Sequence, residues 1–225
     1  MEAITKQENL LFEKWKKDKE SFICDGVANE KKWNQATVKI LFLLREVNDC
    51  SNEFDEREYL NDYTNPKYMR SKTIDNLALW AYGIQKRDDY YSWPQAEYWA
   101  KNSDILQSIA LMNIKKSSGG GTVDWDNFEK YFAVPENQDY IKQQLNIYQS
   151  ADIIVCGGTA YYLNCLYPEK FKEDLWTITN KGIRYIWNDK KLYIDYVHPN
   201  IRAPKNIIYF ALLDALNEIY GTSSL

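Results

Sequence analysis

The sequence predicts an α/β fold, a three-layer α/β/α sandwich in which helices cover both faces of a mostly parallel central sheet. Three near-continuous apolar runs, at 38–44, 109–114 and 151–158, predict strands that are buried on both faces. Segments with helical periodicity lie between the runs, and this alternation is typical of parallel strands joined by crossover helices. The length of 225 residues suits one domain.

The part of the chain before residue 103 is expected to contain helices on either side of one strand. Residues Thr5 to Glu8 fit a capping box, so a helix is expected from there to about residue 21. The strand at 38–44 ends abruptly in polar residues. The stretch from about 55 to 102 is polar and aromatic and contains one helical pattern over 73–84. We expect it to form an insertion that covers one edge of the sheet.

The later elements alternate in the same way. The strand at 109–114 runs into a flexible loop of lysine, serine and glycine. The sequence then predicts a helix over 135–148, the strand at 151–158, a helix over 159–166, a hairpin over 183–197 that turns at Asn188-Asp189, and a helix over 206–220.

Composition excludes several classes of protein. The net charge of −4 rules out a bulk polycation, so a nucleic-acid binder would have to gather its positive charge on one face. The four cysteines show no C-x-x-C spacing, which predicts reduced thiols without a disulfide framework, zinc site or iron–sulfur cluster. A charged N-terminus and the lack of a long apolar run predict a cytoplasmic protein with no signal peptide or membrane span. We expect a monomer without cofactors.

Three polar clusters follow predicted strands. They are Arg45-Glu46-Val47-Asn48-Asp49, Asn113-Ile114-Lys115-Lys116 and His198-Pro199-Asn200-Ile201-Arg202. Because the carboxyl ends of parallel strands open on one edge of a sheet, the clusters are expected to converge in one cleft, the usual ligand site of such folds. His198 is the only histidine, and the proline after it restricts the backbone at the strand end.

In their order and strand context, these clusters resemble the motifs of the uracil-DNA glycosylase superfamily. Its members carry a water-activating motif after one strand, an Asn that reads the base edge after another, and His-Pro-Ser or a close variant near the C-terminus. The corresponding stretches here are 43–49, 111–116 and 197–202, and the glycine-terminated strand at 151–158 fits as well. The resemblance covers roughly residues 38–216, and it implies a DNA glycosylase without a metal or nucleotide cofactor.

The first motif departs from the family pattern. Many members have Gly-Glu-Ala-Pro-Gly or Gly-x-Asn-Pro-Gly there, whereas this chain has Arg45 in place of the first Gly and Asn48-Asp49 in place of Pro-Gly. The cysteines that bind an iron–sulfur cluster in some branches have no counterpart here. A long cation near the pocket floor favours a larger or modified base over uracil itself.

The resemblance implies catalytic roles in the first and third clusters. Cleavage of an N-glycosidic bond needs a group that activates water and stabilises the cationic sugar, and a donor to the departing base. Glu46 is expected in the first role, with Asp49 or Asn48 in reserve, and His198 in the second. The structural alternatives are a salt bridge from Glu46 to Arg45 or another cation, and a hydrogen bond from the imidazole to a backbone carbonyl.

Recognition of the base is expected from one amide and one aromatic ring. The planar amide of Asn113 would pair with the base edge, Phe54 or Tyr59 would stack on the extruded base, and Arg45 would lie at the pocket floor. As alternatives, Asn113 could cap a turn, and either ring could serve core packing alone.

Contacts with DNA are expected from the loops after the second and third clusters. The candidates are Lys115, Lys116, Ser117, Ile201, Arg202 and Lys205. The first three would hold phosphates through charge and backbone amides. The residues after His198 would fill the gap that a flipped base leaves.

The sequence therefore predicts a DNA glycosylase that hydrolyses the bond to a uracil-like or modified base flipped out of DNA. A second hypothesis, which the altered first motif favours, is a catalytically inactive nucleic-acid or nucleotide binding module of the same fold. A third, an unrelated α/β hydrolase or transferase, has little support because no Gly-x-Ser-x-Gly elbow, P-loop or Gly-x-Gly-x-x-Gly motif is present.

Overall fold

The centre of the structure is a seven-stranded sheet of order β1-β3-β2-β4-β7-β6-β5. This computed structural model describes residues 3–48, 50, 54–65, 71–86 and 92–222. The strands are β1 (Gly26–Val27), β2 (Ile40–Leu44), β3 (Ala110–Asn113), β4 (Ile153–Gly157), β5 (Thr177–Ile178), β6 (Arg184–Asn188) and β7 (Lys191–Tyr196).

The sheet is mixed, with a parallel centre and antiparallel margins. The strands β3, β2, β4 and β7 are parallel to one another. At one margin β1 pairs antiparallel with β3, and at the other β6 and β5 continue antiparallel from β7. The parallel arrangement that the sequence predicts for most of the sheet therefore holds only for the four central strands. A tight hairpin joins β6 to β7 and leaves no room for the crossover that a parallel pair needs.

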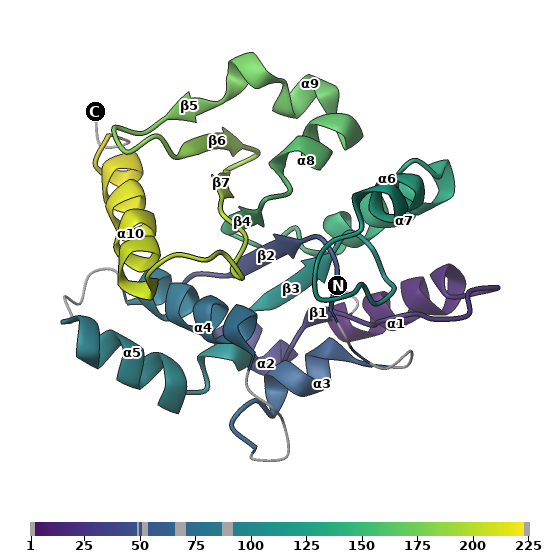
Figure 1. The fold of residues 1–225 in the computed structure, drawn as a ribbon, viewed down its shortest axis with the longest axis horizontal. Coiled ribbons are helices and arrows are strands. Elements are labelled where there is room, and N and C mark those ends of the chain that lie inside the picture. The colour runs from purple at the N-terminus through teal and green to yellow at the C-terminus, as the bar shows by residue number, and fades with distance from the viewer. Residues whose placement is uncertain (1–2, 49, 51–53, 66–70, 87–91, 223–225) are drawn as a thin grey trace.

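Helices lie on both sides of this sheet. They are α1 (Ile4–Trp15), α2 (Glu30–Gln35), α3 (Glu56–Asn61), α4 (Lys72–Gln85), α5 (Trp93–Asn102), α6 (Trp125–Phe132), α7 (Pro135–Ile147), α8 (Ala160–Leu166), α9 (Pro168–Phe171) and α10 (Lys205–Thr222), with short 3-10 turns at Ile105–Ser108 and Glu173–Leu175. In Figure 1, α4, α5 and α10 lie to one side of the strands, and α6, α7 and α8 lie to the other.

Alternate residues of the central strands face two separate cores. In β2, Ile40, Phe42 and Leu44 belong to the core that contains α4 and α10, whereas Leu41 and Leu43 belong to the core that contains α1, α7 and α8. Every side chain of β2 is buried, which is why the strand reads as an apolar run rather than as an alternation. Two cores, one on each face of the sheet, fit the three-layer arrangement that the sequence predicts.

The predicted hairpin is present, with its turn one residue later than the predicted Asn188-Asp189, and the predicted first helix is too long. Asp189 and Lys190 join β6 to β7, and both have positive φ angles (50° and 65°), as two-residue hairpin turns require. The first helix ends at Trp15. The predicted capping box does not form, because the side chains of Thr5 and Glu8 bond to other segments.

Much of the expected insertion belongs to the core. The helix α4 is buried along most of its length, and Leu77, Trp80 and Ala81 are fully enclosed in the core shared with α10. This region therefore forms part of one helical layer instead of only covering an edge. Its position matters for the site, because α4 also contacts the loop that carries His198.

Candidate active site

The polar segments that follow β2 and β3 run side by side. Lys115 N donates to Arg45 O (2.8 Å), and Gly119 N donates to Val47 O (2.7 Å), so backbone pairing continues past the ends of both strands. The parallel register of β2 and β3 thus brings the two loops into contact. Two of the three polar clusters meet here, as the sequence predicts.

Glu46 is buried between these loops and pairs with a lysine. Its Oε2 lies 2.5 Å from Lys115 Nζ, and the exposed fractions of the two side chains are only 2% and 4%. The other carboxylate oxygen, Oε1, is buried and has no hydrogen-bond partner among the described residues. The ion pair fixes the orientation of the carboxylate, while Oε1 keeps its capacity to accept a hydrogen bond.

Gly119 packs directly against this carboxylate. A Cβ atom at position 119 would lie 2.3 Å from Glu46 Oε1, which is far inside contact distance. A Cβ atom at Gly120, by contrast, would meet nothing closer than Thr122 O at 3.9 Å. Only the first of these two glycines is therefore needed to leave room for the carboxylate.

The loop after β7 is held at the same edge of the sheet by α4. Asn76, buried on α4, donates from Nδ2 to Pro199 O (2.6 Å), and Lys72 Nζ donates to Ile201 O (2.7 Å). Within the loop, Ile201 N donates to His198 O (2.9 Å). These hydrogen bonds fix the backbone of the loop that carries His198.

The imidazole of His198 is set up as a neutral donor. Its Nδ1 accepts a hydrogen bond from Asn200 N (3.1 Å), which leaves the proton of the neutral ring on Nε2. Burial, together with the positive charge of Arg45, lowers the pKa of His198 to about 4. At neutral pH the ring can therefore donate from Nε2 without carrying a charge.

Glu46, Asn48 and His198 stand at the junction of two cavities. The smaller has a volume of about 390 Å³ and the larger about 490 Å³, and all three residues line both. All three predicted clusters contribute to this junction or to a cavity beside it, since Asn113 also lines the smaller cavity. Asp49, the reserve candidate, lies outside the described residues.

The smaller cavity contains three of the residues predicted to recognise the base. Phe54, Tyr59 and Asn113 line it, and the centres of the two rings lie 5.7 Å apart. Glu56, which the sequence analysis does not identify, lines it too and accepts a hydrogen bond from Asn113 Nδ2 (2.8 Å). An aromatic wall with an amide and a carboxyl suits a planar heterocycle.

The larger cavity differs from the smaller one in its lining, which includes a cationic side chain and an exposed indole ring. Arg45, Trp125 and Ile201 line it, and the Arg45 guanidinium lies 5.0 Å from the centre of the Trp125 ring. Trp125, which the sequence analysis also does not identify, is 50% exposed. Arg45, which is predicted at the floor of the base pocket, lines this larger cavity and not the cavity of Asn113.

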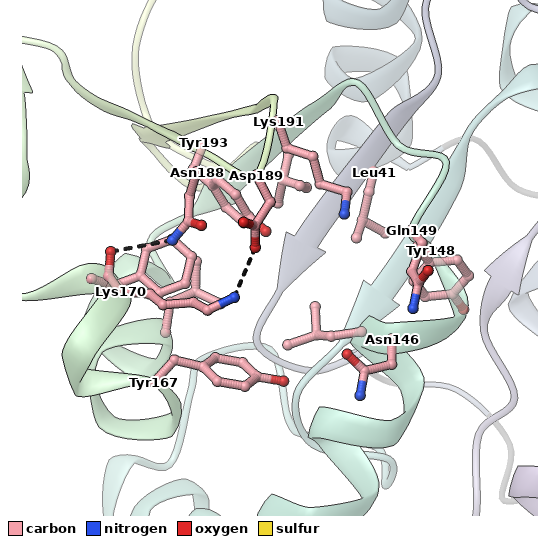
Figure 2. A pocket seen from close by; sticks show the side chains of 14 residues that line it. Leu41, Asn146, Tyr148, Gln149, Tyr167, Lys170, Asn188, Asp189, Lys191 and Tyr193 are labelled. Carbon is pink, nitrogen blue, oxygen red and sulfur yellow. Dashed lines mark hydrogen bonds and ion pairs between the residues drawn. The ribbon is translucent and has the colours of Figure 1, made fainter.

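A third cavity lies elsewhere, against α7, α8 and α9. Its volume is about 100 Å³, and its walls include Leu41, Tyr167 and Tyr193. Figure 2 shows Lys170 paired with Asp189 at this cavity, at a distance of 2.7 Å. It is much smaller than the other two and receives no residue from the three polar clusters, so we place the candidate site at the strand ends.

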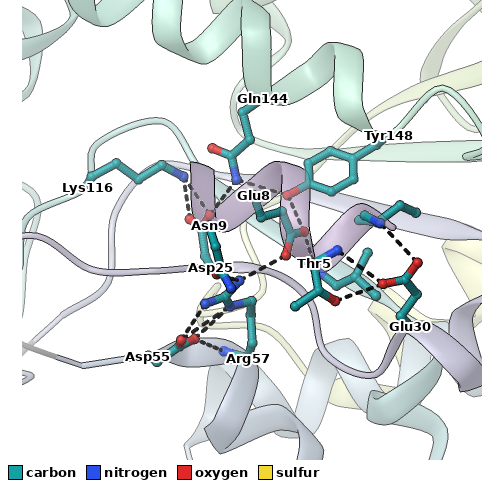
Figure 3. Close-up of polar contacts among 12 residues, drawn as sticks. Thr5, Glu8, Asn9, Asp25, Glu30, Asp55, Arg57, Lys116, Gln144 and Tyr148 are labelled. Atoms are coloured by element: carbon teal, nitrogen blue, oxygen red, sulfur yellow. Dashed lines mark hydrogen bonds and ion pairs between the residues drawn. The ribbon is translucent and has the colours of Figure 1, made fainter. Parts of the chain in front are cut away.

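The two lysines that were expected to hold phosphates are buried. Lys115 pairs with Glu46, and Lys116 Nζ lies 2.6 Å from both carboxylate oxygens of Asp25. The side chains of Lys116 and Asp25 have no exposed surface. Figure 3 shows them in a buried network with Gln144, whose Nε2 donates to Asp25 Oδ1 (2.7 Å). The predicted phosphate contacts of Lys115 and Lys116 are therefore wrong, because both ammonium groups neutralise buried carboxylates.

The other candidates for DNA contact do not gather at the site. Ile201 lines the larger cavity. Ser117 is half-buried and Arg202 is exposed, and neither lines the two cavities. Lys205 Nζ lies 3.8 Å from Asp75 Oδ2, also away from them. Of the six predicted DNA-binding residues, only Ile201 lines one of the two cavities, and Lys115 reaches the catalytic candidates only as the buried partner of Glu46.

Three further observations concern metals, thiols and membranes. Within the described ranges, no group of three or more His, Cys, Asp or Glu side chains is arranged to hold a metal ion. None of the four cysteines, all of which lie in the described ranges, forms a disulfide. None of the described helices combines the length and the apolar character that crossing a membrane requires.

Comparisons with known proteins identify no family. No family model matches the chain, and neither a curated protein nor a solved structure matches it significantly. The functional proposal therefore rests on the geometry of the site and on its motifs.

Proposed function

We propose that the protein is a DNA glycosylase that hydrolyses the bond between deoxyribose and a uracil-like or modified base flipped out of DNA. The observation that carries the proposal is that Glu46, Asn48 and His198 line both cavities at once. A base in the smaller cavity would have its glycosidic bond at this junction, with the sugar and the strand in the larger cavity. The order of the three strand-end motifs supports the same assignment.

The side chains at the junction of the two cavities suit both parts of the reaction, the departure of the base and the attack of water. As the C1′–N bond breaks, its electron pair leaves with the base and positive charge develops on the sugar. The Glu46 carboxylate stabilises that charge and takes a proton from the attacking water, whose oxygen forms the new bond to C1′. His198 donates from Nε2 to a carbonyl of the departing base. The released base anion then takes up a proton from solvent, and Glu46 returns to solvent the proton that it took from water.

The larger cavity offers a surface for the DNA strand. Trp125 is half-exposed and lies against the Arg45 guanidinium. Stacking of a base on such a ring contributes about 1–3 kcal/mol. We therefore assign Trp125 to a nucleotide beside the flipped one.

A search for abasic sites tests the proposal. Single-stranded and duplex DNA carrying uracil, 5-substituted uracils or deaminated purines is incubated with the protein and then treated with alkali. We expect breaks at the modified position for at least one of these bases. Intact strands for every base, in samples where a reference glycosylase cuts the same DNA, would contradict the proposal.

A binding module without turnover is the second candidate function. The pairing of Glu46 with Lys115 favours it, because the lysine already compensates the negative charge that the reaction would use. DNA binding that is tight and unchanged in Glu46→Gln, with no base released by either protein, would identify this function.

Replacement of Gly119 by Ala tests whether the placement of Glu46 matters. The added methyl group would displace Glu46 Oε1, and a misplacement of about 1 Å in an active site can lower a rate about 100-fold. We expect a loss of this size in the single-turnover rate of base release. Gly120→Ala is the matched control, because its methyl group has room, and it should react like the wild type. Equal rates for the two variants would contradict the assignment of Glu46.

A further inference from the structure

Glu56 is a buried carboxyl group in the wall of the smaller cavity, and the mechanism above does not use it. It is the first residue of α3, and its backbone N donates to Cys24 O (2.8 Å). The residue is only 6% exposed, yet its side chain lines the cavity. The helix start is itself fixed, since the Asp55 side chain accepts from Arg57 N (2.9 Å). Glu56 is thus firmly placed where a base would bind.

Asn113 presents its oxygen, and not its nitrogen, to a ligand. Its Nδ2 donates to Glu56 Oε2 (2.8 Å) and, at longer range, to Asp25 Oδ2 (3.4 Å). The same Asp25 oxygen accepts from Asn113 N (2.7 Å), which fixes this end of β3. These hydrogen bonds leave Asn113 Oδ1 and Glu56 Oε1 for a molecule in the cavity. An amide that donates to a base carbonyl would need its Nδ2, and here the protein uses that atom.

The order of the strands puts the three recognition groups in a row. His198 follows β7, Asn113 ends β3, and Glu56 is bonded to Cys24, just before β1. Because the sheet order is β1-β3-β2-β4-β7, Asn113 lies between the other two. A base in the cavity would meet the Nε2–H of His198, then the Oδ1 of Asn113, then the carboxyl of Glu56.

We propose that Glu56 acts as a carboxylic acid that determines which base the site accepts, donating its O–H to O4 of a 2,4-dioxopyrimidine while Asn113 Oδ1 accepts from N3–H. This assignment rests on the proposed function, because it needs a base in the smaller cavity. A cytosine-type edge would set the bare N3 against Asn113 Oδ1 and the 4-amino group against the Glu56 O–H. Both contacts would be repulsive.

The surroundings of Glu56 favour the acid form that this contact requires. Burial, and after it the charge of Asp25, raises the pKa of Glu56 to about 8. Asp55 raises it further, whereas the hydrogen bond from Asn113 and the charge of Lys116 lower it. The carboxyl group therefore carries its proton at neutral pH and loses it as the pH rises through about 8. Above that pH the donor to O4 becomes an acceptor.

Binding of free bases tests the proposal without turnover. The probes are 1-methyluracil and 1-methylcytosine, titrated into the full chain and followed by calorimetry. We expect 1-methyluracil to bind at least about tenfold more tightly than 1-methylcytosine at pH 6.5, a difference of one good polar contact. Glu56→Ala should reduce this preference, because only the contact between N3 and Asn113 Oδ1 would still discriminate. Glu56→Gln should keep it, because the glutamine amide supplies both a donor to O4 and an acceptor for Asn113.

Two controls make the variants interpretable. Glu58→Gln removes an exposed carboxylate from the same helix and should change neither affinity. Thermal unfolding verifies that each variant is folded. Glu56→Gln is also the reference for the pH dependence of binding, because ionisation of the ligand affects this variant and the wild type equally.

The pH dependence of 1-methyluracil binding tests most sharply whether Glu56 acts as an acid. At pH 9, one unit above the pKa of Glu56, about one tenth of the wild-type protein keeps the acid form. The affinity of the wild type for 1-methyluracil should therefore fall about tenfold more than that of Glu56→Gln between pH 6.5 and pH 9.

Three results would overturn the assignment of Glu56: no measurable binding of either base, equal selectivity in wild type and Glu56→Ala, or identical pH profiles for wild type and Glu56→Gln. If selective binding occurs and no base is released from any DNA, the proposed glycosylase function fails and the role of Glu56 in base selection stands.

Discussion

Replacement of Glu46 by Gln is expected to slow base release by about 10²–10⁴-fold, the range for a positioned general base. The glutamine has nearly the same shape, but it can neither stabilise the cationic sugar nor accept a proton from water. Binding of the substrate DNA should be unchanged, because Trp125 and the walls of both cavities remain in place. Single-turnover rates and fluorescence anisotropy with the same DNA measure the two effects separately.

A double variant separates the chemistry of Glu46 from its part in folding. Glu46→Gln leaves Lys115 buried without its counter-charge, and removal of one partner of a buried pair costs about 3–5 kcal/mol. Combining Glu46→Gln with Lys115→Met removes both charges, so stability should recover while base release stays slow. Release at the wild-type rate by the double variant would contradict the catalytic role of Glu46.

Replacement of Lys116 by Met is expected to cause a large loss of stability. Lys116 donates to both oxygens of Asp25, and neither side chain has exposed surface. Without the lysine, Asp25 would remain as a buried charge that has lost its partner, which costs about 3–5 kcal/mol. This is a large part of the 5–15 kcal/mol by which domains are typically stable. The free energy of unfolding in urea measures the loss.

Two further variants control for the change of side chain. Lys130→Met removes a lysine from the exposed part of α6 and should alter the free energy of unfolding little. Asp25→Asn combined with Lys116→Met should recover most of the loss, because an asparagine oxygen can still accept from Gln144 Nε2. A urea midpoint for Lys116→Met equal to that of Lys130→Met would contradict the importance of the buried pair.

Part of the fold could be predicted because the central strands are buried on both faces. The apolar runs at 38–44 and 151–158 contain β2 and β4, whose side chains are all buried. The two-residue strands β1 and β5 are too short for any periodicity. Their antiparallel pairing also depends on distant residues, such as Gly26 opposite Leu111, for which the sequence carries no local signal.

The candidate site could be predicted where it directly follows parallel strands. Glu56 and Trp125 escaped prediction because each begins a helix, and the position of a helix start over the strand ends depends on tertiary packing. The pair Lys115-Lys116 suggested a phosphate-binding loop. Two lysines before a serine–glycine run have the same sequence whether they face solvent or buried carboxylates, and only the structure reveals Glu46 and Asp25 beside them.

The ¹⁵N NMR spectrum of the imidazole tests most directly whether His198 is a neutral donor that faces a base bound in the smaller cavity. Since His198 is the only histidine, protein without an affinity tag gives a single pair of ring signals. We predict a neutral ring protonated on Nε2 at pH 7, a titration midpoint near 4, and a shift of the Nε2 signal when 1-methyluracil is added. A midpoint near the ordinary value of 6.5, with ring signals that do not respond to the base, would contradict the account.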